Sequence, residues 1–316
     1  MKQFLSVSDV PDAFQLVKEG LMLKKNPFQF SELGKNKTLG LIFLNPSLRT
    51  RMSTHKAALN LGMSVMVMNL DKEGWQIEME DGTVMDGGSQ EHIKEAVGVI
   101  SRYCDILGVR TFAGLQDREK DYAEEVLMKF VKYSSIPVVS LESATRHPFQ
   151  SLADWMTIEE HKKTSHPKVV LTWAAHPKAL PQAVPNSFVE WMKIAPVDLV
   201  VTHPEGYELA DEFSHGVKVV YHQDEALKDA DFVYAKNWSS YKYYGQIYNS
   251  DRSWMITPEK MALTNNAKFM HCLPVRRNVI VADAVIDSPN SIVLDEAENR
   301  VYSAQIVLKK ILEGLK

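Results

Sequence analysis

The feature that most constrains this chain is a repeated alternation of short β-rich runs with helical stretches. Parallel strands need a crossover between them, so a strand–helix–strand repeat is the sequence pattern of a parallel sheet. In the N-terminal half, the runs with strand character are Leu39–Leu44, Ser64–Leu70, Asp105–Val109 and Pro137–Leu141. Those in the C-terminal half are Lys168–Trp173, Asp198–Thr202, Val217–Tyr221, Phe232–Ala235 and Lys268–Met270. The sequence therefore predicts an α/β fold.

The alternation also predicts two domains. Helical patterns separate the strands. The ranges of these patterns are Arg49–Leu61, Glu91–Tyr103, Glu119–Tyr133, Phe149–His161, Ser187–Ile194, Asp224–Ala230, Pro258–Leu263 and Ala297–Leu315. The pattern restarts after the polar segment Ser143–Pro148, and 316 residues are enough for two hydrophobic cores. We predict domains at residues 1–145 and 146–296, each a mostly parallel β-sheet flanked by helices. The last helix, residues 297–316, is expected to pack back on the first domain.

Composition argues against several classes of protein. The net charge of −4 offers no general attraction to nucleic acid or to anionic lipid, so neither partner is expected. No apolar run approaches the roughly 20 residues that span a bilayer. Two cysteines are too few for a disulfide scaffold, and the first residues lack the order of a signal peptide. We therefore expect a cytoplasmic protein that binds any anionic substrate through a local group of basic residues.

A first candidate site follows the strand that ends near Phe43. The segment Ser47-Leu48-Arg49-Thr50-Arg51 leads from this strand directly into a helix. Free backbone N–H groups at a helix N-terminus favour an anion, and Arg49 can bind phosphate through its guanidinium. Taken alone, the segment also fits a helix capped by Ser47 with exposed arginines. Arg110 follows another strand, where open α/β sheets bind ligands, and this second cation favours the phosphate site.

A second candidate site combines a helix start with a strand end. His147, Gln150 and Asp154 are separated by helical spacing, so the first two can face one point while Asp154 supports them. In isolation, this pattern equally fits a capped helix with a surface histidine. Cys272 and the Leu273-Pro274 bond, a candidate cis peptide, follow a buried strand. A lone cysteine is usually a small buried hydrophobe, and Cys272 lacks the helix start that would lower the pKa of a nucleophile.

Four ordered motifs resemble those of the aspartate/ornithine carbamoyltransferase family. The Ser-x-Arg-Thr-Arg motif of that family stands here at Ser47–Arg51, and its His-Pro-x-Gln-x-x-x-Asp motif at His147–Asp154. The ornithine-type His-Cys-Leu-Pro is present at His271–Pro274, and Glu296–Arg300 (EAENR) also matches. The resemblance extends from residue 40 to beyond residue 300.

This resemblance implies a carbamoyl phosphate site in the cleft between the two domains. The residues that it implies at the phosphate are Ser47, Leu48, Arg49, Thr50 and Arg110. At the carbonyl oxygen it implies Thr50, Arg110 and His147, and at the amide nitrogen Gln150 with the backbone carbonyls of Cys272 and Leu273, with Arg300 nearby. Donors fixed at the oxygen would stabilise the negative charge that develops when an amine attacks the carbonyl. The resemblance implies no metal and no organic cofactor.

The acceptor segment differs from that of plain ornithine carbamoyltransferases. Their Ser-Met-Gly loop is absent, and Lys236 lies in the corresponding stretch. Because acylation removes the charge of the ornithine α-amine, a lysine that holds carboxylate suits an N-acyl-L-ornithine. The chain thus resembles the N-acetyl- and N-succinylornithine carbamoyltransferases. This resemblance implies a homotrimer with shared active sites, and the residues implied around the acceptor are Glu142, His176, Lys236 and Arg276, with Trp75 from a neighbouring subunit.

Gln90 leaves the acyl group undecided. In the N-acylornithine enzymes, the resemblance implies Pro at this position for succinyl and Glu for acetyl substrates, and this chain has neither. The rest of the chain is closer to the succinyl type, with N-acetyl-L-ornithine and free ornithine as alternatives. A nicotinamide dehydrogenase is disfavoured because the turn after Trp173 lacks the glycine-rich phosphate-binding pattern. A non-catalytic, two-lobed binding protein would carry a secretion signal.

Overall fold

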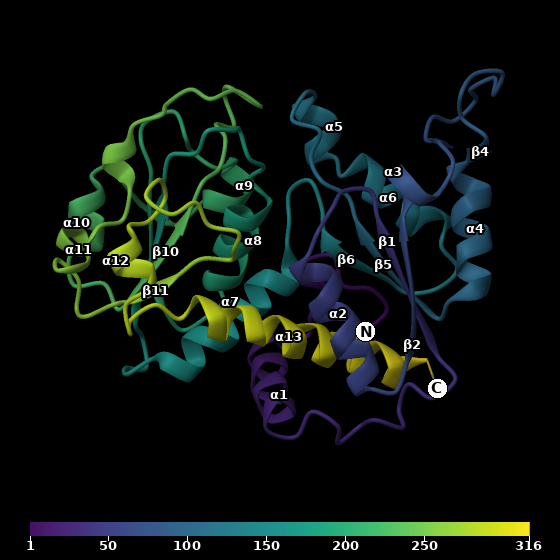
Figure 1. Ribbon diagram of the computed structural model, residues 1–316, viewed down its shortest axis with the longest axis horizontal. Coiled ribbons are helices and arrows are strands. Elements are labelled where there is room, and N and C mark those ends of the chain that lie inside the picture. Colours follow the sequence, from purple (N-terminus) through teal and green to yellow (C-terminus); the bar gives the residue numbers. More distant parts are fainter. Residues whose placement is uncertain (316) are drawn as a thin grey trace. The chain divides into compact units, whose positions relative to one another are not determined.

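The computed structural model describes residues 1–315, apart from the side chain of Asp71, as two compact units. The first comprises Met1–Gly114, Glu119–Phe149 and residues 300–315, and the second comprises Leu115–Arg118 and Gln150–Asn299. Apart from the short segment Leu115–Arg118, the chain enters the second unit within α7 (Pro148–His161) and leaves it within α13 (Val293–Gly314), two helices labelled in Figure 1. The last residue of the predicted helix 297–316 lies outside the described part. The resemblance implies carbamoyl phosphate binding for the domain at residues 1–145 and N-acylornithine binding for that at residues 146–296, and both roles stay predictions.

The first unit is built on a four-stranded parallel sheet of order β2-β1-β5-β6. Its strands are β1 (Thr38–Phe43), β2 (Ser64–Asn69), β5 (Ile106–Arg110) and β6 (Val138–Glu142). Each predicted run agrees with its strand to about one residue at either end. The helices α4 (Ile93–Tyr103) and α6 (Glu125–Tyr133) pack on β1, β5 and β6, whereas α2 (Arg49–Asn60) contacts β2. Buried Val97, Leu107 and Phe130 belong to the core between the sheet and α4 and α6.

Several elements of the first unit differ from the predicted ones. The predicted helix Glu119–Tyr133 is interrupted, and it forms α5 (Arg118–Tyr122) and α6 on either side of Glu124. The unpredicted helix α1 (Ala13–Lys25) begins at Asp12, whose side chain accepts a hydrogen bond from Gln15 N. Residues 91–92, predicted as helix, form the strand β4 (Glu91–His92), which pairs with β3 (Ile77–Glu78). Short helices at Val7–Asp9 and α3 (Leu70–Glu73) complete the unit.

The second unit is built on a five-stranded parallel sheet of order β11-β10-β7-β8-β9. Its strands are β7 (Lys168–Trp173), β8 (Asp198–Thr202), β9 (Lys218–Val220), β10 (Phe232–Lys236) and β11 (Lys268–Met270). These strands confirm the predicted α/β class. The helices besides α7 are α8 (Ala183–Met192), α9 (Asp211–Ser214), α10 (Gln223–Leu227), α11 (Pro258–Met261) and α12 (Asp283–Ile286), with a 3₁₀ turn at Arg252–Trp254.

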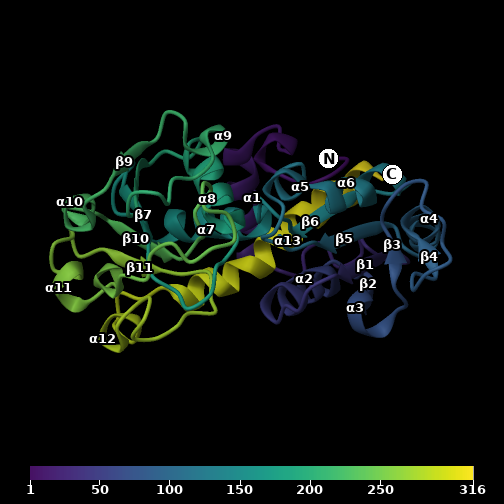
Figure 2. The same cartoon turned by 90° about the horizontal axis from the view of Figure 1, so that it is seen from above.

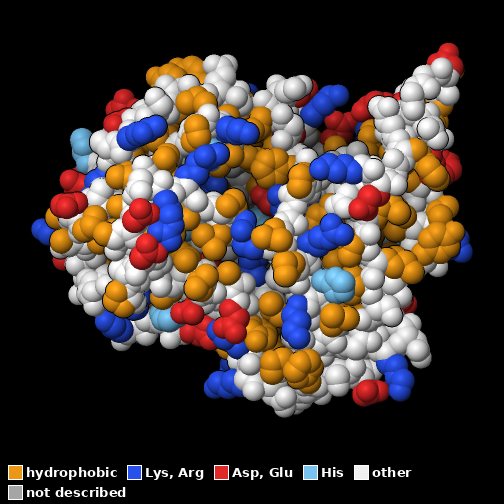
Figure 3. Space-filling model, viewed as in Figure 1, with side chains coloured by type: hydrophobic (Ala, Val, Ile, Leu, Met, Phe, Trp, Pro, Cys, Tyr) orange, Lys and Arg blue, Asp and Glu red, His pale blue; other side chains and the backbone are white. Residues whose placement is uncertain are grey.

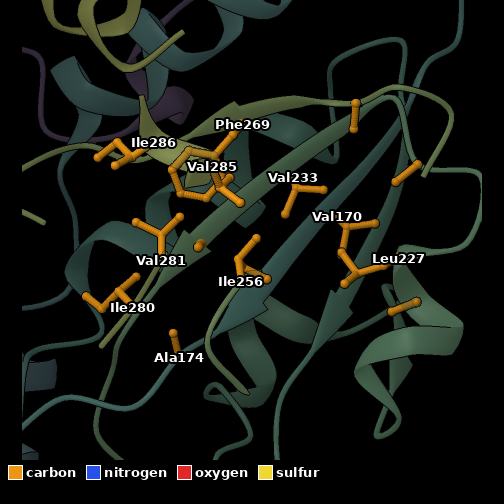
Figure 4. Packing of buried hydrophobic residues seen from close by; sticks show 14 of the residues in the cluster. Val170, Ala174, Leu227, Val233, Ile256, Phe269, Ile280, Val281, Val285 and Ile286 are labelled. Atoms are coloured by element: carbon orange, nitrogen blue, oxygen red, sulfur yellow. The ribbon is translucent and has the colours of Figure 1, made fainter. Parts of the chain in front are cut away.

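The core of the second unit explains why its strands are almost entirely apolar. Figure 4 shows Val170 and Val233 from the sheet packed beside Leu227 of α10 and Val285 of α12. A sheet covered by helices on both faces has no solvent-facing side, so its strands carry continuous hydrophobic runs. No helix in the described part of the chain combines the length and the apolarity needed to cross a bilayer.

Candidate active site

In the first unit, three strand ends bring predicted site residues to one edge of the sheet. The chain passes from β1 into the Ser47–Thr50 segment, while β5 ends at Arg110 and β6 ends at Glu142. Backbone hydrogen bonds hold these ends side by side, because Leu44 N donates to the carbonyl of Arg110 at 3.1 Å and Thr111 N to that of Glu142 at 2.9 Å. Parallel strands share the direction of their carboxyl ends, which is why residues far apart in sequence meet here.

Arg110, Glu142 and His147 form a buried cluster at this edge. The β5–β6 register shifts after Val109, so that Arg110 lies opposite Glu142 and the intervening residue is skipped. Such irregularities re-aim side chains. Arg110 Nη1 lies 2.5 Å from Glu142 Oε2, and His147 Nε2 lies 3.5 Å from the same oxygen. The shared carboxylate thus holds two of the three predicted carbonyl-oxygen donors together.

The start of α2 is open toward an anion. Leu48 stands at the N-cap position and no side chain caps the helix, so the structure does not support the alternative of a Ser47 cap. Thr50, in the first turn, accepts a hydrogen bond from Arg300 Nη2 at 2.7 Å, and both residues are buried. The structure therefore brings the predicted Thr50 and Arg300 together at a helix N-terminus.

Trp75 and Gln90 lie together on an arm formed by residues 74–92. The β3–β4 pairing closes this arm, and Gln90 N donates to the carbonyl of Gln76 at 3.0 Å. Trp75 Nε1 donates to Glu91 Oε2 at 2.8 Å, although 54% of the Trp75 surface is exposed. Figures 1 and 2 both show β4 next to α4 at one end of the first unit. In this unit, then, the arm presents a large aromatic side chain to solvent.

In the second unit, two carboxylates orient the side chain of Gln150. Its Nε2 donates to Asp154 Oδ1 at 2.8 Å and to Glu296 Oε1 at 3.0 Å. Both donor positions of the amide are thereby used, which assigns the other terminal atom as oxygen. That oxygen, Oε1, is buried and has no hydrogen-bond partner among the described residues. An amide N–H of a ligand is the group that this acceptor suits.

Glu296 also fixes the strand end that carries Cys272. Its second oxygen accepts a hydrogen bond from His271 N at 2.9 Å, and Leu273 N donates to His271 Nδ1 at 2.8 Å. The Leu273–Pro274 peptide is cis, as predicted. From the sequence, Glu296 was noted only as part of a motif. Its role in orienting Gln150 and His271 was not predicted, because both residues are far from it in the chain.

The Cys272 thiol is protonated at neutral pH. Burial raises its pKa to about 11, the positive charge of Lys236 opposes this shift, and the charges of Glu296 and Asp154 add to it. Burial also raises the pKa of Tyr234, beside the thiol. This environment is opposite to that of a nucleophilic cysteine, whose pKa is lowered by nearby cations or a helix start.

Cationic side chains gather around His176 at the carboxyl ends of β7 and β10. Arg276 Nε donates to His176 Nε2 at 3.0 Å, and His176 Nδ1 lies 2.9 Å from the carbonyl of Lys178. Nε2 therefore accepts from the Arg276 guanidinium, and Nδ1 accepts a hydrogen bond from Lys178 N at 3.0 Å. Burial first, and then the positive charges of Lys236, Arg276 and Lys178, lower the pKa of His176, so its ring is neutral at pH 7. A neutral histidine between cations is suited to an anionic group.

Two protein-family models match this chain, one in each half. Residues 2–160 match the model of the aspartate/ornithine carbamoyltransferase carbamoyl-P binding domain, and residues 181–311 match that of the Asp/Orn binding domain. The chain is 56% identical to the N-succinylornithine carbamoyltransferase of Bacteroides thetaiotaomicron, over 100% of both sequences. It is 39% identical to the N-acetylornithine carbamoyltransferase of Xanthomonas campestris, over 99% of this chain and 98% of that one.

A solved structure shows the same fold with ligands bound. A point variant of N-acetyl-L-ornithine transcarbamylase, complexed with carbamyl phosphate and N-succinyl-L-norvaline, is 37% identical and superposes with a TM-score of 0.92. The match covers 98% of this chain and 100% of that chain. Together, the two matched domain models and the full-length similarity show that this chain belongs to the aspartate/ornithine carbamoyltransferase family of transferases.

Proposed function

We propose that this enzyme transfers the carbamoyl group of carbamoyl phosphate to the δ-amine of N-succinyl-L-ornithine, giving N-succinyl-L-citrulline and phosphate. The observation that carries the proposal is the group of Lys236, Arg276 and neutral His176, which suits an acceptor with more than one carboxylate. The full-length identity of 56% to an N-succinylornithine carbamoyltransferase supports it. N-acetyl-L-ornithine is the second candidate acceptor, because a solved acetylornithine transcarbamylase of the same fold is complexed with acetylcitrulline.

The proposed chemistry needs only fixed donors and two aligned substrates. The phosphate group lies at the start of α2, near Ser47, Leu48, Arg49 and Thr50, with Arg300 beside Thr50. When the neutral δ-amine attacks the carbonyl carbon, the new N–C bond forms and negative charge develops on the carbonyl oxygen. Thr50, Arg110 and His147 stabilise that charge. The C–O bond to phosphate then breaks, the electron pair leaves with the phosphate, and the phosphate takes the amine proton.

We assign the carbamoyl nitrogen to acceptors on Gln150, Cys272 and Leu273. Oε1 of Gln150 accepts one of its N–H groups, because the amide of Gln150 is oriented by Asp154 and Glu296. The backbone carbonyls of Cys272 and Leu273 accept the other. Cys272 acts through its carbonyl rather than its sulfur, in agreement with the raised pKa of the thiol. Holding both reactants at fixed positions supplies much of the remaining rate acceleration.

On the acceptor side, Lys236 and Arg276 bind carboxylates of the acylornithine and His176 adds a neutral contact. Glu142, which pairs with Arg110, is the acid that we assign to the acceptor. Free ornithine carries a charged α-ammonium that meets Lys236 and Arg276 without a matching acid. An unpaired charge in a partly dry site costs several kcal/mol, enough for about a thousandfold discrimination.

We also propose a homotrimer in which Trp75 and Gln90 complete the active site of a neighbouring subunit. The edge strand β2 and the arm expose large apolar side chains, and hydrophobic groups stand at the surface in Figure 3. These exposed side chains are Met66, Met68, Trp75, Val84 and Met85. Apolar groups on an edge strand and an arm are typical of a protein interface. A cytoplasmic location and a role in arginine biosynthesis are the expected setting.

Release of phosphate from carbamoyl phosphate, measured with a panel of acceptors, tests the proposal. We expect phosphate release with N-succinyl-L-ornithine, weaker release with N-acetyl-L-ornithine and essentially none with L-ornithine. Product mass must rise by one carbamoyl group for each phosphate released, which excludes simple hydrolysis. Efficient use of L-ornithine would contradict the N-acylornithine assignment, and release without any acceptor would contradict carbamoyl transfer.

A further inference from the structure

Glu124 has a backbone conformation that its side-chain type rarely adopts. It lies between α5 and α6 with φ 52° and ψ 35°, in the left-handed region where a Cβ crowds the neighbouring carbonyl oxygen. Although it occupies the N-cap position of α6, its side chain makes no capping hydrogen bond. Strained residues persist where the surrounding structure holds them, often near functional sites. The side chain of Glu124 therefore serves something other than its own helix.

The carboxylate of Glu124 is surrounded by donors from the turn that follows β6. Oε1 accepts hydrogen bonds from Thr145 N at 2.8 Å and from the hydroxyl groups of Ser143 and Thr145, both at 2.5 Å. Oε2 accepts one from Ala144 N at 3.1 Å. All three turn residues are buried, so their N–H and O–H groups need partners within the protein. One carboxylate satisfies four of these donors.

This turn joins two residues of the candidate active site. Glu142, which pairs with Arg110, is the last residue of β6 before the turn at residues 143–146. His147 is the first residue after this turn. Ser143 N donates to the carbonyl of Arg146 at 2.7 Å, which closes the turn on itself. The position of the turn therefore sets the distance between Glu142 and His147, and through Glu142 the position of the Arg110 guanidinium.

We propose that Glu124 is a positioning residue for carbamoyl transfer. Its carboxylate holds the turn at residues 143–146 so that His147 and Arg110 both point at the carbonyl oxygen of carbamoyl phosphate. The inference rests on the proposed function, which assigns that oxygen to these two donors. Glu124 acts through the turn and not on the reacting atoms.

Replacement of Glu124 by an isosteric amide tests this role. Glu124→Gln keeps the size of the side chain but replaces one of the two acceptor oxygens with an NH₂ group. This donor would face the N–H and O–H donors of the turn. Because a displacement of about 1 Å can cost a hundredfold in rate, we expect kcat to fall at least about tenfold with the KM for N-succinyl-L-ornithine little changed. The matched control is Glu125→Gln, which loses the same charge at the next residue and only the ion pair with Lys129. The control should keep its kcat.

A double-mutant cycle separates positioning from a general loss of stability. If Glu124 acts through His147, Glu124→Gln should lower kcat much less in a His147→Asn background than in the wild type. A residue that only stabilises the fold would give the same loss in both backgrounds. Equal losses, or an unchanged kcat in the single Glu124→Gln variant, would overturn the inference.

Hydrogen exchange tests the contact itself without any need for activity. Glu124→Gly removes the carboxylate together with the strained Cβ, so relief of the strain offsets part of the stability lost with the hydrogen bonds, and we expect a folded variant with a lowered melting temperature. The amides of Ala144 and Thr145 should exchange faster in this variant, and in Glu124→Gln if that variant folds. Unchanged exchange would show that the carboxylate does not hold the turn. A wild type that fails to transfer carbamoyl groups would overturn the proposed function but leave this measurement valid.

Discussion

Arg110 illustrates at the scale of one residue how a proposed catalytic donor is also part of the fold. Its guanidinium is buried, lies 2.5 Å from Glu142 and stacks near the ring of Phe112. From the sequence alone, a strand-end arginine looks replaceable without effect on folding. The structure shows instead that loss of Arg110 would remove the guanidinium that neutralises the buried Glu142 carboxylate.

Arg110→Ala is therefore expected to impair both activity and stability. Loss of a charged donor at the carbonyl oxygen should lower kcat/KM about 10²- to 10³-fold. The orphaned Glu142 should lower the free energy of unfolding by about 3 kcal/mol. Steady-state kinetics and chemical denaturation measure the two effects. The matched control is the double variant Arg110→Ala/Glu142→Gln, which should regain much of the stability and none of the activity. Near-normal turnover of Arg110→Ala at saturating carbamoyl phosphate would contradict the active-site assignment.

The Cys272 thiol leads to a prediction about pH. Because burial raises its pKa to about 11 from an ordinary value of 9.0, iodoacetamide should alkylate it slowly below pH 9 and faster toward pH 11. The folded-state pKa is raised, so the stabilisation linked to the protonated thiol is complete below pH 9 and is lost as pH rises through about 11. The melting temperature should thus fall more steeply over this range in the wild type than in Cys272→Ala.

A Cys104→Ala background restricts the alkylation to one thiol. In this background, Cys272→Ala should keep kcat/KM within about tenfold of its parent, because only the backbone carbonyl is used. Half-maximal alkylation near pH 7, or loss of all activity in Cys272→Ala, would indicate a reactive thiolate instead.

At the scale of elements, the arm around Gln90 is held to α4 and α6 by charged contacts from the middle of its sequence. Asp81 pairs with Lys94 at 2.9 Å, and Lys129 lies 3.3 Å from Glu80. The hydrogen bond from Lys94, followed by its charge, lowers the pKa of Asp81. The arm that carries Trp75 and Gln90 is therefore attached to these helices and is not a free loop.

Replacement of Gln90 by Glu should change the acyl preference. The added carboxylate repels the second carboxylate of a succinyl group and leaves an acetyl group unaffected. We expect the kcat/KM ratio of N-succinyl- to N-acetyl-L-ornithine to fall by about tenfold or more, which corresponds to about 1.4 kcal/mol of repulsion. Gln90→Asn is the neutral control and should keep the ratio close to that of the wild type. An unchanged ratio in Gln90→Glu would show that residue 90 does not contact the acyl group.

Elements were predictable where local pattern alone determines them. The central strands β1, β5, β7 and β10 are apolar runs because they are buried in their sheets, and this pattern is visible in the sequence. The break at Glu124 was not predictable, since its local sequence favours helix and the carboxylate is held by a turn 20 residues away. The pairing of Arg110 with Glu142 depends on a register shift between strands. Contacts across the fold, rather than local propensity, decide such positions.

At the scale of the whole molecule, the exposed arm has a consequence for assembly. Trp75 is more than half exposed, and its ring is oriented by the hydrogen bond to Glu91. The exposed ring is therefore available to contact a second subunit. In a cyclic trimer, each subunit would offer its arm to one neighbour and receive the arm of the other. In this proposed arrangement, the phosphate site around Arg49 would belong to the receiving subunit.

Mixing two inactive variants tests this shared site. Arg49→Ala lacks the phosphate contact and Trp75→Ala lacks the arm contact, so each homotrimer should be nearly inactive. After the two are mixed and reassembled, a site with Arg49 from one variant and Trp75 from the other is complete. Random 1:1 assembly makes about a quarter of the sites complete in a ring where each site joins two subunits. We therefore expect up to about a quarter of wild-type activity in the mixture, and none in a mixture of Arg49→Ala with an Arg49→Ala/Trp75→Ala double variant. Mixed trimers that form, as shown by native mass spectrometry, yet regain no activity would place the arm in its own active site or outside the reaction.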